Sequence, residues 1–226
     1  MTAQPIPRSR AAIDRRYAQP AAAAVLLCAA IGLGWGVLAR VLTDSPTAAL
    51  HDLVVYAAVW IAGIATIGRT ARSPQLAAWS GAAAYGAAVI GYYGWSTLVL
   101  GRPADLPALG WAAVAVTVCP ALAALTSWSL SARGVLGGIV LAVLAGAILV
   151  DGTTQQLLLR ATGQLPATIA LHPVQAVLDF ALVLLTVLVL PRSGRTRFAA
   201  VVAAVPCIAF LPGTLAVLAY STGLLD

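Results

Sequence analysis

The chain has 226 residues, of which 61% are hydrophobic and only 9% are charged. Soluble domains are about 45–50% apolar and about 25% charged, so this composition excludes a water-soluble fold. The 13 basic residues outnumber the 7 acidic ones. The basic residues lie in short clusters between apolar runs, which is typical of membrane-orientation signals and argues against nucleic-acid binding.

The apolar runs predict an all-α, polytopic transmembrane helix bundle with about seven spans. Crossing about 30 Å of hydrocarbon needs roughly 20 helical residues, and seven stretches approach that length. Residues 1–19 carry arginines and prolines and predict a cytoplasmic arm, followed by one transmembrane domain over residues 20–226. The predicted spans lie near 20–42, 50–68, 75–100, 107–129, 134–150, 173–191 and 198–221.

The arginines predict the orientation of these spans, because cytoplasmic loops are enriched in basic residues. With the N-terminus inside and the C-terminus outside, only Arg40, Arg102 and Arg160 fall outside. The inner arginines are then Arg8, Arg10, Arg15, Arg16, Arg69, Arg72, Arg133, Arg192, Arg195 and Arg197.

Small residues four positions apart predict close contacts between these helices. Such pairs are Gly32 with Gly36, Ala82 with Gly86, Ala87 with Gly91, and Gly134 with Gly138. Prolines predict kinks or breaks in the fourth span at Pro120 and in the seventh at Pro206 and Pro212. Each proline is open to two interpretations, a kink that improves packing or a discontinuous helix that lines a substrate path.

Asp179 is the most informative single residue. The apolar run that follows it, residues 180–190, covers only roughly 16 Å, so the span must begin near Pro173. Asp179 then lies about 9 Å below the end of the span, where a charge costs about 2.5–3.5 kcal/mol. We expect the side chain to face the bundle interior, either as a functional site or as a polar packing pair with a neighbouring span.

His172 and Gln175 share a helix face with Asp179, because the three residues are spaced i, i+3 and i+7. An imidazole near the outer interface suits a proton relay or acid–base role. The alternative interpretation of His172 is a solvated cap residue.

Other polar residues fall at the same predicted ends of the spans. They are Arg40, Asp52, Tyr56, Asp151 and Tyr92. We expect them to line a pocket open to the outer side of the membrane. The alternatives are that Tyr92 belongs to an interfacial aromatic belt and that Arg40 reaches the lipid headgroups.

The cysteines predict neither a metal site nor a disulfide. Cys28, Cys119 and Cys207 each lie inside an apolar run with no second ligand at a suitable spacing. No metal and no cofactor is predicted.

Three short sequence features carry a resemblance. They are Gly32-Leu33-Gly34-Trp35-Gly36 in the first span, Gly91-Tyr92-Tyr93 in the third, and Asp151-Gly152 after the fifth. With these features the chain resembles small alanine-rich multispan membrane proteins of actinobacteria that carry a domain of unknown function. The resemblance implies a multi-pass protein of the bacterial cytoplasmic membrane and assigns no residue a role.

Three functions remain open at this point. The first is small-solute transport or ligand binding through an outward-facing polar cavity that contains Asp179. The second is a membrane enzyme that acts on a lipid or isoprenoid at the outer leaflet, with Asp179 and His172 as acid–base groups. The third is a non-catalytic partner subunit, alone or in an oligomer. The chain has no phosphate-binding glycine loop and no metal-ligand cluster, which favours a role other than catalysis.

Overall fold

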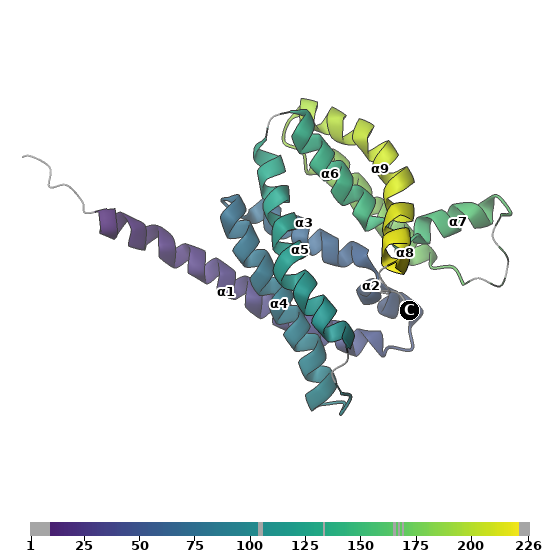
Figure 1. The fold of residues 1–226 in the computed structure, drawn as a ribbon, viewed down its shortest axis with the longest axis horizontal. Coiled ribbons are helices and arrows are strands. Elements are labelled where there is room, and N and C mark those ends of the chain that lie inside the picture. The colour runs from purple at the N-terminus through teal and green to yellow at the C-terminus, as the bar shows by residue number, and fades with distance from the viewer. Residues whose placement is uncertain are drawn as a thin grey trace, which may run out of the picture.

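The computed structural model describes residues 10–103, 106–132, 134–164, 166, 168 and 170–221, with side chains between residues 21 and 209. Within these ranges every regular element is a helix, which confirms the all-α fold class (Figure 1). The elements are α1 (Arg10–Thr43), α2 (Ala48–Val55), α3 (Ala57–Thr70), α4 (Pro74–Leu98), α5 (Leu106–Ser131), α6 (Val135–Ile148), α7 (Thr153–Ala161), α8 (Pro173–Leu184), the π-helical turn η1 (Leu185–Val189) and α9 (Gly194–Ser221).

Two helices of the described chain are long and apolar enough to cross a membrane, over Ala21–Thr43 in α1 and Pro107–Ser131 in α5. Two bent pairs raise this number to four if each pair is one span. In these pairs α2 meets α3 at 50° and α6 meets α7 at 68°. The shorter apolar helix Pro173–Val189 combines α8 and η1.

The prolines that were predicted to kink or break helices do not break them. α5 runs through Pro120, and α9 runs through Pro206. Pro212 also falls in α9, but its side chain lies outside the described residues. The breaks that do occur, between α2 and α3 and between α6 and α7, contain no proline.

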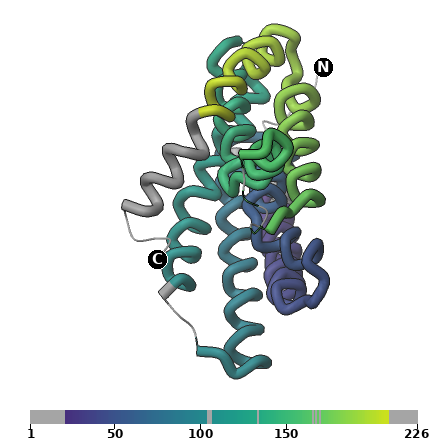
Figure 2. Tube along the Cα trace, turned by 90° about the vertical axis from the view of Figure 1, so that its right-hand side faces the viewer, coloured from purple at the N-terminus to yellow at the C-terminus, as the bar shows by residue number. Residues whose placement is uncertain are grey.

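α3 lies at the centre of the fold and contributes to two buried apolar clusters. Its residues Ala58, Ile61 and Ala65 belong to the larger cluster, which also draws on α6, α8, η1 and α9. Ile64 joins a smaller cluster with residues of α4 and α5, two helices that run side by side (Figure 2). Both faces of α3 are therefore covered by protein.

α1 packs against α4 through glycines that allow the two backbones to touch. A Cβ atom placed on Gly32 would lie 2.0 Å from the carbonyl oxygen of Ala84, and one on Gly36 would lie 2.0 Å from that of Ala88. No side chain fits in that space. The predicted contact at Gly32 and Gly36 is present, and α1 and α4 are held together over this stretch.

The outside of the bundle is apolar. Large hydrophobic side chains are exposed on α1, α4, α5, α6, α8 and α9, among them Leu26, Ile90, Leu109, Leu136, Val177 and Phe198. Buried positions, in contrast, include charged and amide side chains such as Asp179 and Gln175. An apolar exterior around a partly polar interior is the arrangement that lipid favours, so the chain is a membrane protein.

Candidate functional site

The bend between α2 and α3 leaves two backbone groups without helical partners, and side chains satisfy both. Tyr56 has extended backbone angles of φ −78° and ψ 152°. The indole Nε1 of Trp60 donates to the carbonyl of Val54 at 2.8 Å. The backbone N–H of Ala57, the first residue of α3, donates to Oδ2 of Asp151 at 2.6 Å. The bend is thus held by two specific hydrogen bonds.

Asp151 belongs to the second bend, between α6 and α7. The chain turns there through Gly152, whose positive φ of 70° lies in the left-handed region that favours glycine. The Asp151 carboxylate reaches across to the N-terminus of α3, where the helix dipole favours a negative charge. The two bends therefore meet at a single hydrogen bond.

Asp179 of α8 lies beside this junction with only 1% of its surface exposed. Its Oδ1 accepts a hydrogen bond from Gln175 Nε2 at 2.5 Å, and its Oδ2 accepts one from the hydroxyl of Thr153, the first residue of α7. Gln175 and Thr153 are also buried. The carboxylate is therefore paired with neutral donors from α7 and from its own helix.

His172 and Asp52 form a pair closer to the solvent. Nδ1 of His172 lies 2.7 Å from Oδ2 of Asp52, and the imidazole packs edge-on against the ring of Tyr56 at 5.4 Å between centroids. The His172 side chain is 28% exposed, whereas Asp52 is buried. Tyr56 directly precedes Ala57, whose N–H binds Asp151, so this pair adjoins the bend between α2 and α3.

Six of the predicted site residues thus come together, and one unpredicted residue joins them. We call this group the carboxylate cluster: Asp52, Tyr56, Asp151, His172, Gln175 and Asp179, with Thr153. Among the residues whose side chains are described, no set of three or more His, Cys, Asp or Glu is placed to hold a metal ion.

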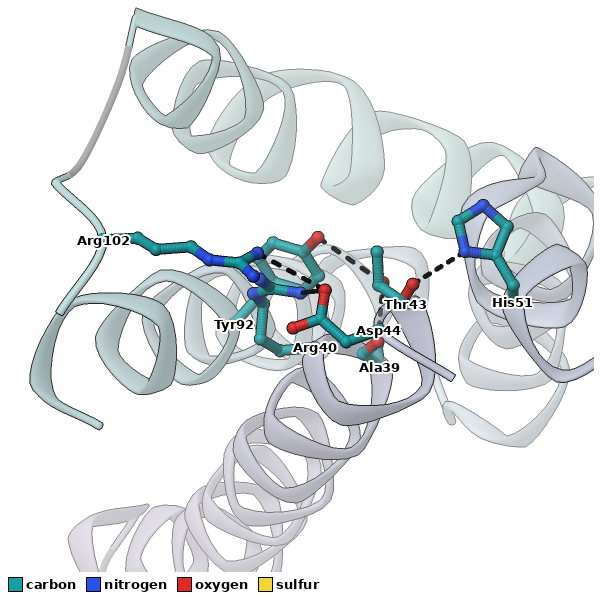
Figure 3. A network of polar contacts seen from close by, with 7 residues as sticks. All are labelled: Ala39, Arg40, Thr43, Asp44, His51, Tyr92 and Arg102. Atoms are coloured by element: carbon teal, nitrogen blue, oxygen red, sulfur yellow. Dashed lines mark hydrogen bonds and ion pairs between the residues drawn. The ribbon is translucent and has the colours of Figure 1, made fainter. Parts of the chain in front are cut away.

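The remaining predicted residues, Arg40 and Tyr92, belong to a second group (Figure 3). The Arg40 side chain is only 3% exposed, lies 3.0 Å from Asp44, and places its guanidinium 5.5 Å from the centre of the Tyr92 ring. Arg102 reaches the same Asp44 oxygen at 3.3 Å. Arg40 is thus held by a carboxylate and an aromatic face.

We call this second group, formed by Arg40, Asp44, Tyr92 and Arg102, the Arg40 network. It adjoins the carboxylate cluster through the end of α1. The Tyr92 hydroxyl lies 3.5 Å from Thr43 Oγ1, and His51 Nδ1 lies 2.7 Å from the Thr43 carbonyl. His51 directly precedes Asp52 of the cluster. The predicted residues therefore form two neighbouring groups.

Asp44 provides a prediction about pH. The hydrogen bond from Arg40, supported by the charges of Arg40 and Arg102, lowers the pKa of Asp44 below its ordinary value of 3.8. The stabilisation is therefore present at neutral pH and is lost as the pH falls through the lowered pKa. We expect Asp44→Asn to lower the melting temperature at pH 7, and this difference from the parent should shrink below about pH 4. A difference that is unchanged at low pH would contradict the ion pair.

Two cavities lie away from the carboxylate cluster. One, of about 410 Å³, has a mainly apolar lining from α1, α3 and α4. The other, of about 350 Å³, lies at the C-terminal end of α3, the end far from the carboxylate cluster. No residue of the carboxylate cluster lines either of these two cavities.

Comparison with known proteins gives one result. A model of a family of unknown function matches residues 15–222, which include every residue of both groups. No curated protein and no solved structure matches the chain.

Proposed function

The chain belongs to the family of unknown function DUF6518, and we propose that it binds a small solute or a proton at the carboxylate cluster and carries it across the membrane. The observation that supports this proposal most directly is the hydrogen bond from Ala57 N–H to Asp151, where two bent helix pairs meet. Discontinuous helices that meet near polar side chains are the usual construction of transporter binding sites.

The proposed orientation has seven spans in a bacterial cytoplasmic membrane, with the N-terminus inside and the C-terminus outside. The arginine distribution supports this orientation, since ten of the thirteen arginines then lie inside. The carboxylate cluster would then lie toward the outer face. The C-terminal end of α3 and the loop after it, which contains Arg72, would lie toward the cytoplasm.

The chemistry of the cluster suits a site that changes protonation. Carboxylates in a membrane interior are rare and mark ion or proton paths. His172 is partly exposed and pairs with Asp52, and its ring contacts Tyr56, which directly precedes the Ala57–Asp151 hydrogen bond. Protonation of a carboxylate would weaken its hydrogen bonds as an acceptor and loosen the junction between the bends.

Cysteine accessibility tests this proposal. His172→Cys, Gln175→Cys and Asp179→Cys would be made singly in a version with Cys28, Cys119 and Cys207 replaced by alanine, and intact cells would be treated with a membrane-impermeant thiol reagent. We expect fast reaction at position 172 and slower but complete reaction at 175 and 179, because a transport cycle must open the site to the outside.

Two control positions make the result interpretable. Ala176→Cys is equally buried on the same helix but lies outside the cluster, so it should not react. Gly194→Cys, at an exposed helix start with open space around it, should react only after the membrane is permeabilised. Equal reaction at 176 and 179 would indicate local unfolding and would contradict a solvent path.

A second function, the non-catalytic partner subunit, is favoured by a different observation. Asp179, Gln175 and Thr153 satisfy one another and are almost fully buried. Such a self-contained network also suits a purely structural role. Complete protection of positions 175 and 179 in the labelling experiment would support this function over transport.

A further inference from the structure

The cavity at the far end of α3 has a basic lining drawn from separate parts of the chain. Arg69 lies in the last turn of α3, Arg72 in the following loop, and Arg192 between η1 and α9. Ser127 and Ser131 of α5 complete its polar wall. A volume of about 350 Å³ is within the range of small-ligand sites, which begins near 300 Å³.

The charge of this cavity is not neutralised by the protein. No ion pair among the described residues includes Arg69, Arg72 or Arg192, and no carboxylate lines the cavity. Asp151 binds the opposite end of α3, about 20 Å away along the helix. Several cations facing one space without an anion repel each other, so the cavity favours a negatively charged ligand.

Ser127 supplies a second, independent indication. Its neighbours on α5 use their hydroxyls locally, since Thr126 donates to Leu122 O and Ser131 donates to Ser127 O. The Ser127 hydroxyl has no hydrogen bond among the described residues, although the residue is only 5% exposed and lines the cavity. The hydroxyl is therefore open to the cavity, where a ligand or water can complete its hydrogen bonding.

We propose that this cavity binds the phosphate of an anionic phospholipid headgroup. Guanidinium groups match phosphate oxygens with paired N–H donors, and the Ser127 hydroxyl is placed to add a further donor. The cavity lies where α3 and α5, two apolar helices, end beside basic loops. Basic pockets between membrane helices on the cytoplasmic side are suited to lipid headgroups. This site is separate from the carboxylate cluster. Its cytoplasmic placement rests on the proposed orientation of the spans, and its ligand does not depend on the function proposed for the cluster.

The test compares variants of equal charge on the full-length, detergent-purified protein. Native mass spectrometry would count bound phosphatidylglycerol or phosphatidylcholine, and the apparent Kd would be measured for each. We expect Arg69→Gln/Arg192→Gln to weaken phosphatidylglycerol binding at least tenfold. Arg195→Gln/Arg197→Gln removes two exposed arginines outside the cavity and should change binding less than twofold. Equal losses in the two variants would overturn the proposal.

Ser127→Ala leaves the charge of the cavity unchanged and should weaken binding severalfold, so an unchanged affinity would count against the cavity as the site. Equal affinity of the parent protein for phosphatidylcholine would also overturn recognition of an anionic headgroup. Glycerol 1-phosphate distinguishes the two sources of phosphate. If it binds as tightly as the lipid, with the same dependence on Arg69 and Arg192, the ligand is a soluble phosphate and the lipid assignment is wrong.

Discussion

Gly32→Ala in α1 is expected to destabilise the protein by about 2–3 kcal/mol, because the new methyl group would meet a backbone carbonyl that cannot turn away. A Cβ atom at position 32 would lie only 2.0 Å from the carbonyl oxygen of Ala84. α1 would have to move off α4 along its length. Gly36→Ala faces the same distance to Ala88 O, and the double variant should show a larger loss.

Gly34→Ala is the matched control, since it lies on the same helix with no atom within 4 Å of its Cβ position. Alanine has a higher helix propensity than glycine, so this variant should be neutral or more stable by about 0.5–1 kcal/mol. The measurement is unfolding in mixed detergent micelles, followed by circular dichroism. If Gly32→Ala and Gly34→Ala are equally stable, α1 does not contact the α4 backbone at this point.

Asp179→Leu should destabilise the protein by about 3 kcal/mol. The substitution removes the acceptor for two buried donors, the Gln175 amide and the Thr153 hydroxyl. A buried donor without an acceptor costs about 1–3 kcal/mol. The same unfolding measurement gives the loss, with Ala176→Leu as a control for added volume on the same helix.

The double variant Asp179→Leu/Gln175→Leu should recover more than half of this loss, because it also removes the amide that would otherwise lack a partner. No recovery would mean that the Gln175–Asp179 hydrogen bond contributes little. A stable double variant is also the form in which to measure solute or proton movement, since any defect would then reflect the missing acid and not unfolding.

The sequence predicts contacts within one helix better than contacts between helices. The spacing of Gln175 and Asp179 places them on one face, and the structure joins them directly. Thr153 could not be identified in this way, because its contact with Asp179 depends on how α7 folds back on α8. A hydroxyl directly after Asp151-Gly152 was the only local signal.

Small-residue spacing shows the same limit. Gly32, Gly36, Gly91 and Gly138 contact other helices closely, whereas Gly86 and Gly134 have no atom within 4 Å of a Cβ position. Spacing places two glycines on one face but does not determine whether another helix lies against it. The bend at Tyr56 was missed for a related reason, since Asp151, which stabilises it, lies 94 residues away from Ala57.

The short helix formed by α8 and η1 has a consequence for the surrounding bilayer. Residues 173–189 extend at most about 26 Å, less than the roughly 30 Å thickness of a typical hydrocarbon core. Hydrophobic mismatch of this kind is relieved by local thinning of the bilayer. If this segment is one of the spans, headgroups from both leaflets would be drawn inward at its ends, toward His172 on one side and Arg192 on the other. Membrane thickness, set by lipid chain length, would then influence how readily polar molecules reach either end of the protein.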